Sequence, residues 1–156
     1  ERGDSLVDIG AYCLMPNHFH ILAKETNEGG ISKFMGKLTT SYSKYFNIKY
    51  DRVGPLFQGR FKAEHVNNDE YLKYLFAYIH LNPVKLIDSK WREGGISNVE
   101  KTKNYLANYR YSSHLDYLGI QREERLILAR ESFPEYFIST RTFENFMDDW
   151  LTFKPE

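Results

Sequence analysis

Two histidines separated by one residue are the side chains of this sequence best placed to bind a metal ion. His18 and His20 lie in the stretch 15–22, Met-Pro-Asn-His-Phe-His-Ile-Leu. In a β-strand alternate side chains point to the same face, so the two imidazoles would lie side by side. Neutral imidazole is the commonest nitrogen ligand for a divalent ion. Because His-x-His also occurs by chance in ordinary strands, this histidine pair does not establish a metal site by itself.

A tyrosine and an asparagine one helical turn apart supply a second group of reactive side chains. The apolar spacing predicts a helix over residues 70–81, and Tyr78 and Asn82 are four positions apart at its end. They can therefore reach the same ligand if the last turn holds. Pro83 disfavours helical geometry at Asn82, which would place the carboxamide on a partly unwound end. A half-buried tyrosine with an asparagine at the helix C-terminus is the alternative interpretation.

Together these residues form a unit that could act on a phosphodiester. The histidine pair and the Asn82 oxygen could hold Mg²⁺ or Mn²⁺, the ion would polarise the phosphate, and Tyr78 would attack phosphorus. A phenol is a poor nucleophile at neutral pH unless a base or a cation assists it, and the sequence shows no obvious base. Two imidazoles and one neutral oxygen would also bind Zn²⁺, Co²⁺ or Ni²⁺, so composition does not select the ion.

These side chains must be positioned by a hairpin and by helices. Alternating hydrophobicity on either side of a Pro-Asn turn predicts two strands, and helical spacing predicts two amphipathic helices, the second with Asn68 or Asp69 as N-cap. A third short strand is expected after a glycine-containing loop. The predicted strands are 6–14, 18–24 and 60–66, and the predicted helices are 31–50 and 70–81.

A basic segment, residues 31–62, stands out in a chain that is neutral overall. It holds seven basic residues and one acidic residue, whereas the whole chain has 21 of each sign. Such local asymmetry is typical of a phosphate-binding surface, although a solvated helix face is the alternative. Aromatic rings interleave with the charges, and bases stack on exposed rings in single-strand binders, but we expect most of these rings to be buried core. The expected DNA contacts are Lys33, Lys37, Lys44, Gln58, Arg60 and Lys62.

Length and composition set the remaining bounds. A chain of 156 residues has the size of one domain. Its single cysteine, Cys13, excludes a disulfide framework within the chain, which suits a reducing compartment. No apolar run approaches the length needed to cross a bilayer, so we expect no membrane partner.

Three stretches in this order resemble the three conserved segments of the HUH single-tyrosine transposases, and more closely the branch that includes REP-associated tyrosine transposases. They are the residues 15–22 quoted above, Gly-Pro-Leu-Phe-Gln-Gly-Arg-Phe-Lys at 54–62, and Tyr-Ile-His-Leu-Asn-Pro-Val at 78–84. The resemblance implies a ferredoxin-like α+β core, an antiparallel sheet with helices on one face. It implies that His18, His20 and Asn82 are metal ligands and that Tyr78 is the nucleophile. It also implies cleavage of single-stranded DNA through a 5′-phosphotyrosine link, with Mg²⁺ or Mn²⁺ and no nucleotide cofactor.

The chain departs from that family at its beginning, because similar members carry a further strand and helix before the hairpin. Without them one edge of the sheet would lie open and the core would be incomplete. We therefore expect an N-terminally truncated catalytic core at residues 1–88 and a helical extension packed on it at 89–156. In that extension we expect a loop at 91–98, a short helix from Ser112 through Leu118, a helix at 121–132 and a terminal helix after Pro134. From Arg122 onward the net charge is −3, which argues against DNA binding over that whole surface.

Two classes of function follow from the sequence. The first is a transposase-like endonuclease and strand transferase acting at hairpin-containing single-stranded DNA. The second is a domesticated hairpin-binding or regulatory protein that keeps the fold and has lost transposition. A metal-dependent hydrolase that uses water as nucleophile is a more distant reading. The active site could be completed within one chain or across a homodimer, and we expect a bacterial cytoplasmic location, at the nucleoid when DNA is bound.

Overall fold

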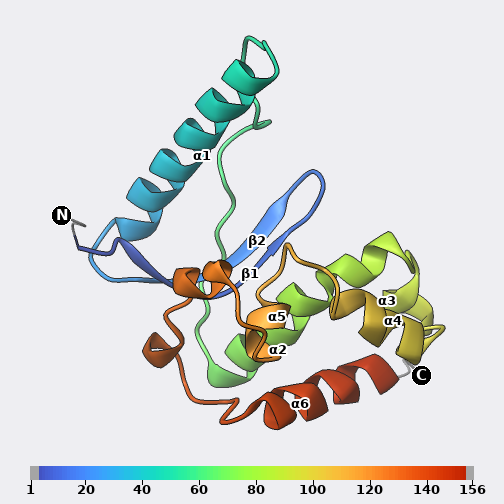
Figure 1. The fold of residues 1–156 in the computed structure, drawn as a ribbon. Coiled ribbons are helices and arrows are strands. Elements are labelled where there is room, and N and C mark those ends of the chain that lie inside the picture. Colours follow the sequence, from blue (N-terminus) through green and yellow to red (C-terminus); the bar gives the residue numbers. More distant parts are fainter. Residues whose placement is uncertain (1–3, 154–156) are drawn as a thin grey trace. The chain divides into compact units, whose positions relative to one another are not determined.

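The computed structural model describes residues 4–153, and residues 1–3 and 154–156 lie outside the described part (Figure 1). Two strands open the chain and are followed by helices and short 3₁₀ turns. The elements are β1 (Val7–Leu14), β2 (Phe19–Glu25), α1 (Gly30–Lys49), α2 (Asp69–Leu81), η1 (Asn82–Leu86), α3 (Trp91–Gly94), α4 (Val99–Leu106), α5 (His114–Tyr117), η2 (Glu123–Ile127), η3 (Arg130–Ser132) and α6 (Thr140–Thr152).

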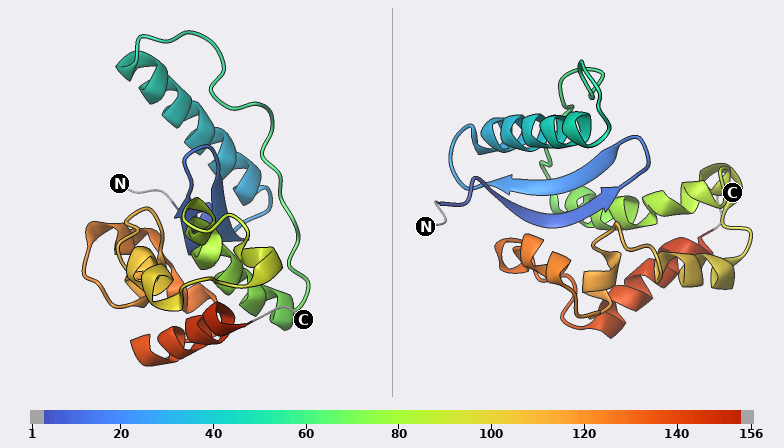
Figure 2. Two further views of the ribbon diagram at one scale, coloured as in Figure 1. Left: turned by 90° about the vertical axis from the view of Figure 1, so that its right-hand side faces the viewer. Right: turned by 45° about the horizontal axis from the view of Figure 1, so that its top comes forward.

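The fold is α+β, as predicted, and its strands pair in a two-stranded antiparallel sheet (Figure 2). The predicted hairpin is confirmed at 7–25, and the two predicted long helices are confirmed as α1 and α2. The chain divides into two compact units. The first unit comprises the residues up to Asp8 and Ala23–Val66, and the second unit comprises Ile9–Leu22 and the chain from Asn67 onward. Both strands cross from one unit to the other, so the turn of the hairpin belongs to the second unit.

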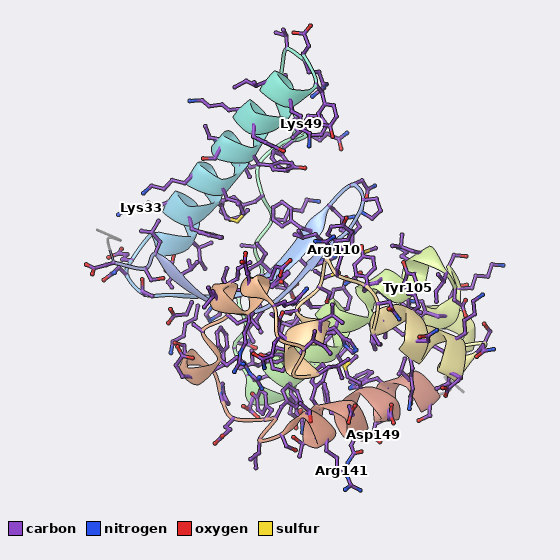
Figure 3. All side chains as sticks on the ribbon, viewed as in Figure 1. Lys33, Lys49, Tyr105, Arg110, Arg141 and Asp149 are labelled. Atoms are coloured by element: carbon purple, nitrogen blue, oxygen red, sulfur yellow. The ribbon has the colours of Figure 1, made fainter. Side chains whose placement is uncertain are left out.

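In the first unit, α1 carries its charges outward. Lys33 and Lys49 lie near opposite ends of this helix and project from it (Figure 3). At its start, a Cβ on Gly30 would lie 2.2 Å from the carbonyl oxygen of Leu6, so only glycine allows the chain to pass there. The prediction that most of the rings in the basic segment are buried core is wrong, because Tyr42, Tyr45, Tyr50 and Phe61 are 48%, 57%, 57% and 41% exposed.

The predicted strand at 60–66 does not form. Residues 61–67 have no regular secondary structure, and all but Val66 of 60–66 are exposed. A strand needs a neighbour to satisfy its backbone groups, and among the described residues the sheet contains β1 and β2 alone. The position of residues 60–66 after a glycine-containing loop was therefore insufficient evidence for a strand.

The second unit is built around α2, whose ends match the sequence prediction. The side chain of Asn68 accepts a hydrogen bond from the N–H of Tyr71 at 2.7 Å, which identifies Asn68 as the N-cap. Acidic residues follow in the first turn, where they oppose the positive end of the helix dipole. The buried face of α2 contributes Phe76, Ile79 and Leu81 to the core, and α2 packs against α6.

Several predictions for the C-terminal part need correction. The predicted helix at 121–132 is instead two 3₁₀ segments, η2 and η3, because its apolar residues Leu126 and Ile127 are 83% and 48% exposed and provide no buried face. The predicted loop at 91–98 contains the short helix α3, and α4 was not predicted. The short helix expected from Ser112 forms as α5, with Ser113 at its N-cap and no side-chain cap bond. The terminal helix is confirmed as α6, which begins with a capping box at Ser139.

The edge of β1 that the truncated sheet was expected to leave open is covered by later parts of the chain. The N–H of Leu14 donates to the carbonyl of Tyr111 at 2.8 Å, and the N–H of Ser113 donates to the carbonyl of Tyr12 at 3.0 Å. Further along the strand, the N–H of Ala129 donates to the carbonyl of Ile9 at 2.9 Å. These bonds satisfy backbone groups on the edge of β1 that does not pair with β2, and these groups would otherwise be unpaired.

In the part of the chain that is described, no helix is long and apolar enough to cross a membrane.

Two buried histidines lie in the core of the second unit. His80 is fully buried and His114 is 6% exposed, and their ring centroids are 5.8 Å apart. Burial lowers the pKa of His114 to about 4 and lowers that of His80 well below its ordinary value. Both imidazoles are therefore neutral in the folded protein near neutral pH.

The free energy of unfolding of the second unit should decrease in mild acid. Below pH 6.5 the two histidines take up protons in the unfolded chain but stay neutral in the folded protein. Their contribution to the free energy of unfolding is therefore full above that pH and is lost as the pH falls. Between pH 7 and pH 5 protonation of unfolded His114 should lower the free energy of unfolding by about 2 kcal/mol, and His80 should act in the same direction. Urea unfolding followed by fluorescence measures this, because both tryptophans, Trp91 and Trp150, belong to the second unit. His114→Leu should reduce the pH dependence of the free energy of unfolding, and an unchanged dependence in this variant would contradict the linkage.

Candidate active site

The histidine pair lies at the turn of the β1–β2 hairpin. The turn is closed by a bond from the N–H of Met15 to the carbonyl of His18 at 2.8 Å, and His20 follows on β2. The imidazole centroids of His18 and His20 are 5.1 Å apart, with the rings edge to face at 89°. The two imidazoles thus lie side by side, as the sequence spacing predicted, with His18 directly before the first residue of β2.

The neighbouring asparagine orients one of these rings. The Nδ1 of His18 lies 2.7 Å from the Oδ1 of Asn17, so an Nδ1–H tautomer donates to the amide oxygen. In that tautomer Nε2 keeps its lone pair, which is the form that binds a metal ion. A hydrogen bond of this kind also fixes the orientation of a metal-binding imidazole.

Tyr78 lies against the second histidine of the pair. The ring centroids of His20 and Tyr78 are 5.4 Å apart and the rings meet edge to face at 87°. Partial burial lowers the pKa of His20, and the nearby charges of His18 and Arg92 lower that pKa further. His20 is therefore favoured as the neutral imidazole that metal binding requires.

Asn82 continues directly from the helix that carries Tyr78. It is 3% exposed, keeps right-handed helical geometry with φ −52° and ψ −40°, and begins η1. Its Nδ2 donates to the carbonyl of Tyr78 at 3.0 Å. The helix end is therefore tightened into a 3₁₀ turn by Pro83 rather than unwound, and the amide oxygen is the atom of this side chain that could serve as a ligand.

An arginine that sequence reasoning missed completes this group. The guanidinium carbon of Arg92, on α3, lies 4.7 Å from the centroid of the Tyr78 ring. Hydrophobic periodicity provided no signal for this arginine, because residues 91–98 were predicted to form a loop. Its position depends on how the chain turns back after η1, which is a tertiary feature.

The side chains gathered around Tyr78 are of types that bind divalent metal ions. The histidine pair supplies two imidazoles, and Asn82 would supply a neutral oxygen; such mixed nitrogen and oxygen donors suit several first-row metals. Within residues 4–153 no cluster of three or more histidine, cysteine, aspartate or glutamate side chains could hold a metal. A metal at the histidine pair would thus need the amide of Asn82, substrate oxygens or water to complete its coordination.

The predicted DNA contacts all belong to the first unit, whereas the four predicted catalytic and metal-binding residues belong to the second unit. Every one of the predicted DNA contacts is exposed: Lys33, Lys37, Lys44, Gln58, Arg60 and Lys62. The first three lie along α1, and the others lie in the irregular segment that follows it. The structure therefore leaves these polar side chains accessible to a ligand.

Comparison with known proteins gives a match over about half of the chain. Residues 3–82 match the family model described as "Transposase IS200 like". No curated protein and no solved structure matches the chain. The matched region includes the histidine pair, Tyr78 and Asn82, and Arg92 lies outside it.

Metal binding should depend on the histidine pair and on the asparagine that orients it. His18→Ala and His20→Ala should each weaken Mn²⁺ binding by ~10–100-fold or more, because each removes a nitrogen ligand. Asn17→Ala should weaken it by about 10-fold, because ring orientation is lost while the ligand remains. Isothermal titration with Mn²⁺ measures the affinities, with the exposed His65→Ala as the control. Equal affinities in the wild type and both histidine variants would show that the pair is not a metal site.

Proposed function

The chain belongs to the IS200-like transposase family, and we propose that it cleaves and rejoins single-stranded DNA through Tyr78 with the help of a divalent metal ion. Membership of the family gives a transposase-type function with DNA as the partner. The nucleophile, the metal-binding residues and hairpin DNA as substrate are the specific parts of the proposal.

The contact between Tyr78 and His20 is the observation that supports this proposal best. Strand β2 and helix α2 are far apart in the sequence, yet the two rings pack at 5.4 Å. A nucleophile beside a metal-binding histidine would meet a phosphate that the metal polarises. The Tyr78 ring is half-buried, so its position is restrained while it stays accessible to a substrate.

The proposed reaction exchanges one phosphate ester for another. The phenolic oxygen of Tyr78 forms a bond to the scissile phosphorus, and the bond from phosphorus to the 3′ oxygen breaks. The phenol loses a proton and the departing 3′ oxygen gains one. The products are a 5′-phosphotyrosine link and a free 3′-hydroxyl, and attack by another 3′-hydroxyl reverses the step and joins strands. Mg²⁺ or Mn²⁺ held by His18, His20 and Asn82 would supply charge neutralisation at the phosphate.

The first unit supports single-stranded DNA as the substrate. Along α1 and the segment after it, the exposed basic side chains alternate with exposed rings, and Tyr42, Tyr45 and Tyr50 are 48%, 57% and 57% exposed. Backbone phosphates bind to cations of this kind, and unpaired bases stack on accessible rings. Hairpin-containing DNA is proposed from the resemblance to REP-associated transposases.

Covalent capture tests the proposed function. The protein is incubated with Mn²⁺ and a single-stranded hairpin library labelled at both ends, and the products are separated under denaturing conditions and analysed by mass spectrometry. An adduct in which Tyr78 carries the 5′ phosphate would support the proposal. Retention of particular hairpins without an adduct would indicate a binding protein, and release of both DNA ends would indicate a hydrolase that uses water.

Replacing Tyr78 by phenylalanine should abolish the adduct and leave hairpin binding within about twofold of wild type, because only the attacking oxygen is removed. Tyr74→Phe is the matched control, since Tyr74 lies one turn earlier on α2 with its ring 5.8 Å from that of Tyr78. Gel shift measures binding and a denaturing gel measures the adduct. Continued adduct formation by Tyr78→Phe would exclude Tyr78 as the nucleophile.

Replacing Lys33, Lys37 and Lys44 together by glutamine should weaken DNA binding and reduce its salt dependence. Up to three phosphate contacts are lost, so the slope of log K against log salt should fall in magnitude by up to about 2 for single-stranded DNA. Lys101, Arg125 and Arg141 are exposed residues of the second unit, and replacing them by glutamine gives the same change in net charge. If both triple variants keep the wild-type slope, α1 does not bind phosphates.

A further inference from the structure

Arg92 is a charged side chain at the candidate site whose role the family match does not explain. It lies ten residues beyond the end of the matched region, is exposed, and its guanidinium carbon sits 4.7 Å from the Tyr78 ring centroid and 5.4 Å from that of Trp91. Arg92 forms no ion pair with a carboxylate of the described residues, unlike Lys103, which pairs with Asp148, and Arg122, which pairs with Asp116. Its charge thus remains available for an anion next to Tyr78.

The segment that carries Arg92 is held in a closed loop. The Oδ2 of Asp88 accepts hydrogen bonds from the Oγ of Ser97 at 2.8 Å and from its backbone N–H at 3.1 Å. These bonds lower the pKa of Asp88, which therefore stays ionised and keeps both ends of the loop together. The N–H of Trp91 donates to the carbonyl of Asp88 at 3.4 Å, where α3 begins. Arg92 is thus presented to α2 by a hydrogen-bonded turn and not by a free loop.

The contact with Tyr78 leaves the guanidinium able to bind a ligand. An arginine over an aromatic ring is attracted to the face of the ring, and the N–H groups at the edge of its plane remain donors. A planar guanidinium binds a phosphate through two parallel hydrogen bonds, which suits it to hold and neutralise a phosphodiester. The anion expected next to the attacking phenol of Tyr78 is the scissile phosphate.

We propose that Arg92 is a catalytic residue that binds a non-bridging oxygen of the scissile phosphate. This inference rests on the proposed function of Tyr78 as nucleophile. When the phenolic oxygen bonds to phosphorus and the bond to the 3′ oxygen breaks, negative charge builds up on the non-bridging oxygens. Arg92 stabilises that charge and keeps its own protons throughout, while the phenol loses a proton and the 3′ oxygen gains one.

A charge-free substrate tests this role directly. The hairpin captured by the wild-type protein is synthesised with an ordinary phosphate or with a neutral methylphosphonate at the scissile position, and adduct formation on both is timed with Mn²⁺. With the ordinary phosphate, Arg92→Ala should react ~10²–10³-fold more slowly than the wild type. With the methylphosphonate, the difference between the two proteins should shrink to within about tenfold, because the charge that Arg92 stabilises is absent.

Two further variants separate a catalytic role from a structural one. Arg92→Lys keeps the charge and loses the paired donors, so it should fall between the wild type and Arg92→Ala on the ordinary phosphate. Arg110→Ala is the matched control, because Arg110 (Figure 3) is a second exposed arginine of the same unit and lies over the ring of Tyr111 at 5.7 Å. It should show the wild-type ratio of rates on the two substrates.

The outcomes distinguish failure of this inference from failure of the proposed function. If the wild type forms the Tyr78 adduct but Arg92→Ala is equally impaired on both substrates, Arg92 only positions Tyr78 and the inference is wrong. If Arg92→Ala reacts at the wild-type rate, the inference is also wrong and the proposed function stands. If the wild type captures no hairpin on Tyr78, the proposed function fails and the inference fails with it.

Discussion

The arrangement of the second unit depends on the hydroxyl of Ser113, because this buried group joins the strand and the helix that lead to the candidate site. Its oxygen accepts from the N–H of Tyr12 on β1 at 2.9 Å and lies 2.7 Å from the Nε2 of His80 on α2. His80 lies two residues after Tyr78, and β1 pairs with the strand that carries His20. Removing the hydroxyl would leave buried polar groups unpaired, at a cost of about 1–3 kcal/mol each. The same loss would loosen the register of α2 against the hairpin.

A buried ion pair supports this contact by holding the segment in which Ser113 lies. The carboxylate of Asp116 has no exposed area and pairs with Arg122, which also donates to the carbonyls of Arg110 and Ser112 and to the hydroxyl of Tyr12. The carboxylate and the carbonyls satisfy most of the donors of the guanidinium, as a buried charge requires. The segment from Tyr111 to Ala129 therefore does more than cover apolar surface, because its backbone also pairs with that of β1.

Sequence patterns predicted the elements whose stabilisation is local. The hairpin follows from alternation and a turn, and α2 follows from its apolar spacing and the Asn68 cap. The predicted strand at 60–66 failed because a strand exists only if a partner is available, which no local pattern reveals. The helix at 121–132 failed because its apolar residues found no surface to cover. Similarly, the spacing of His18 and His20 predicted their proximity, whereas Arg92 reaches Tyr78 only through the turn that Asp88 closes.

The passage of both strands between the two units has a consequence for how such a protein can diversify. Residues 23–66 leave the second unit after Leu22 and return to it at Asn67, and together with the residues up to Asp8 they form the first unit. The proposed nucleic-acid-binding residues lie in this segment, and the proposed reacting residues lie outside it. Substitutions that alter affinity for a target can therefore accumulate in one unit without disturbing the core that supports the chemistry. Exchange of the part of this segment that lies outside both strands, residues 26–66, between homologues would then retarget the protein and leave the reactive group intact.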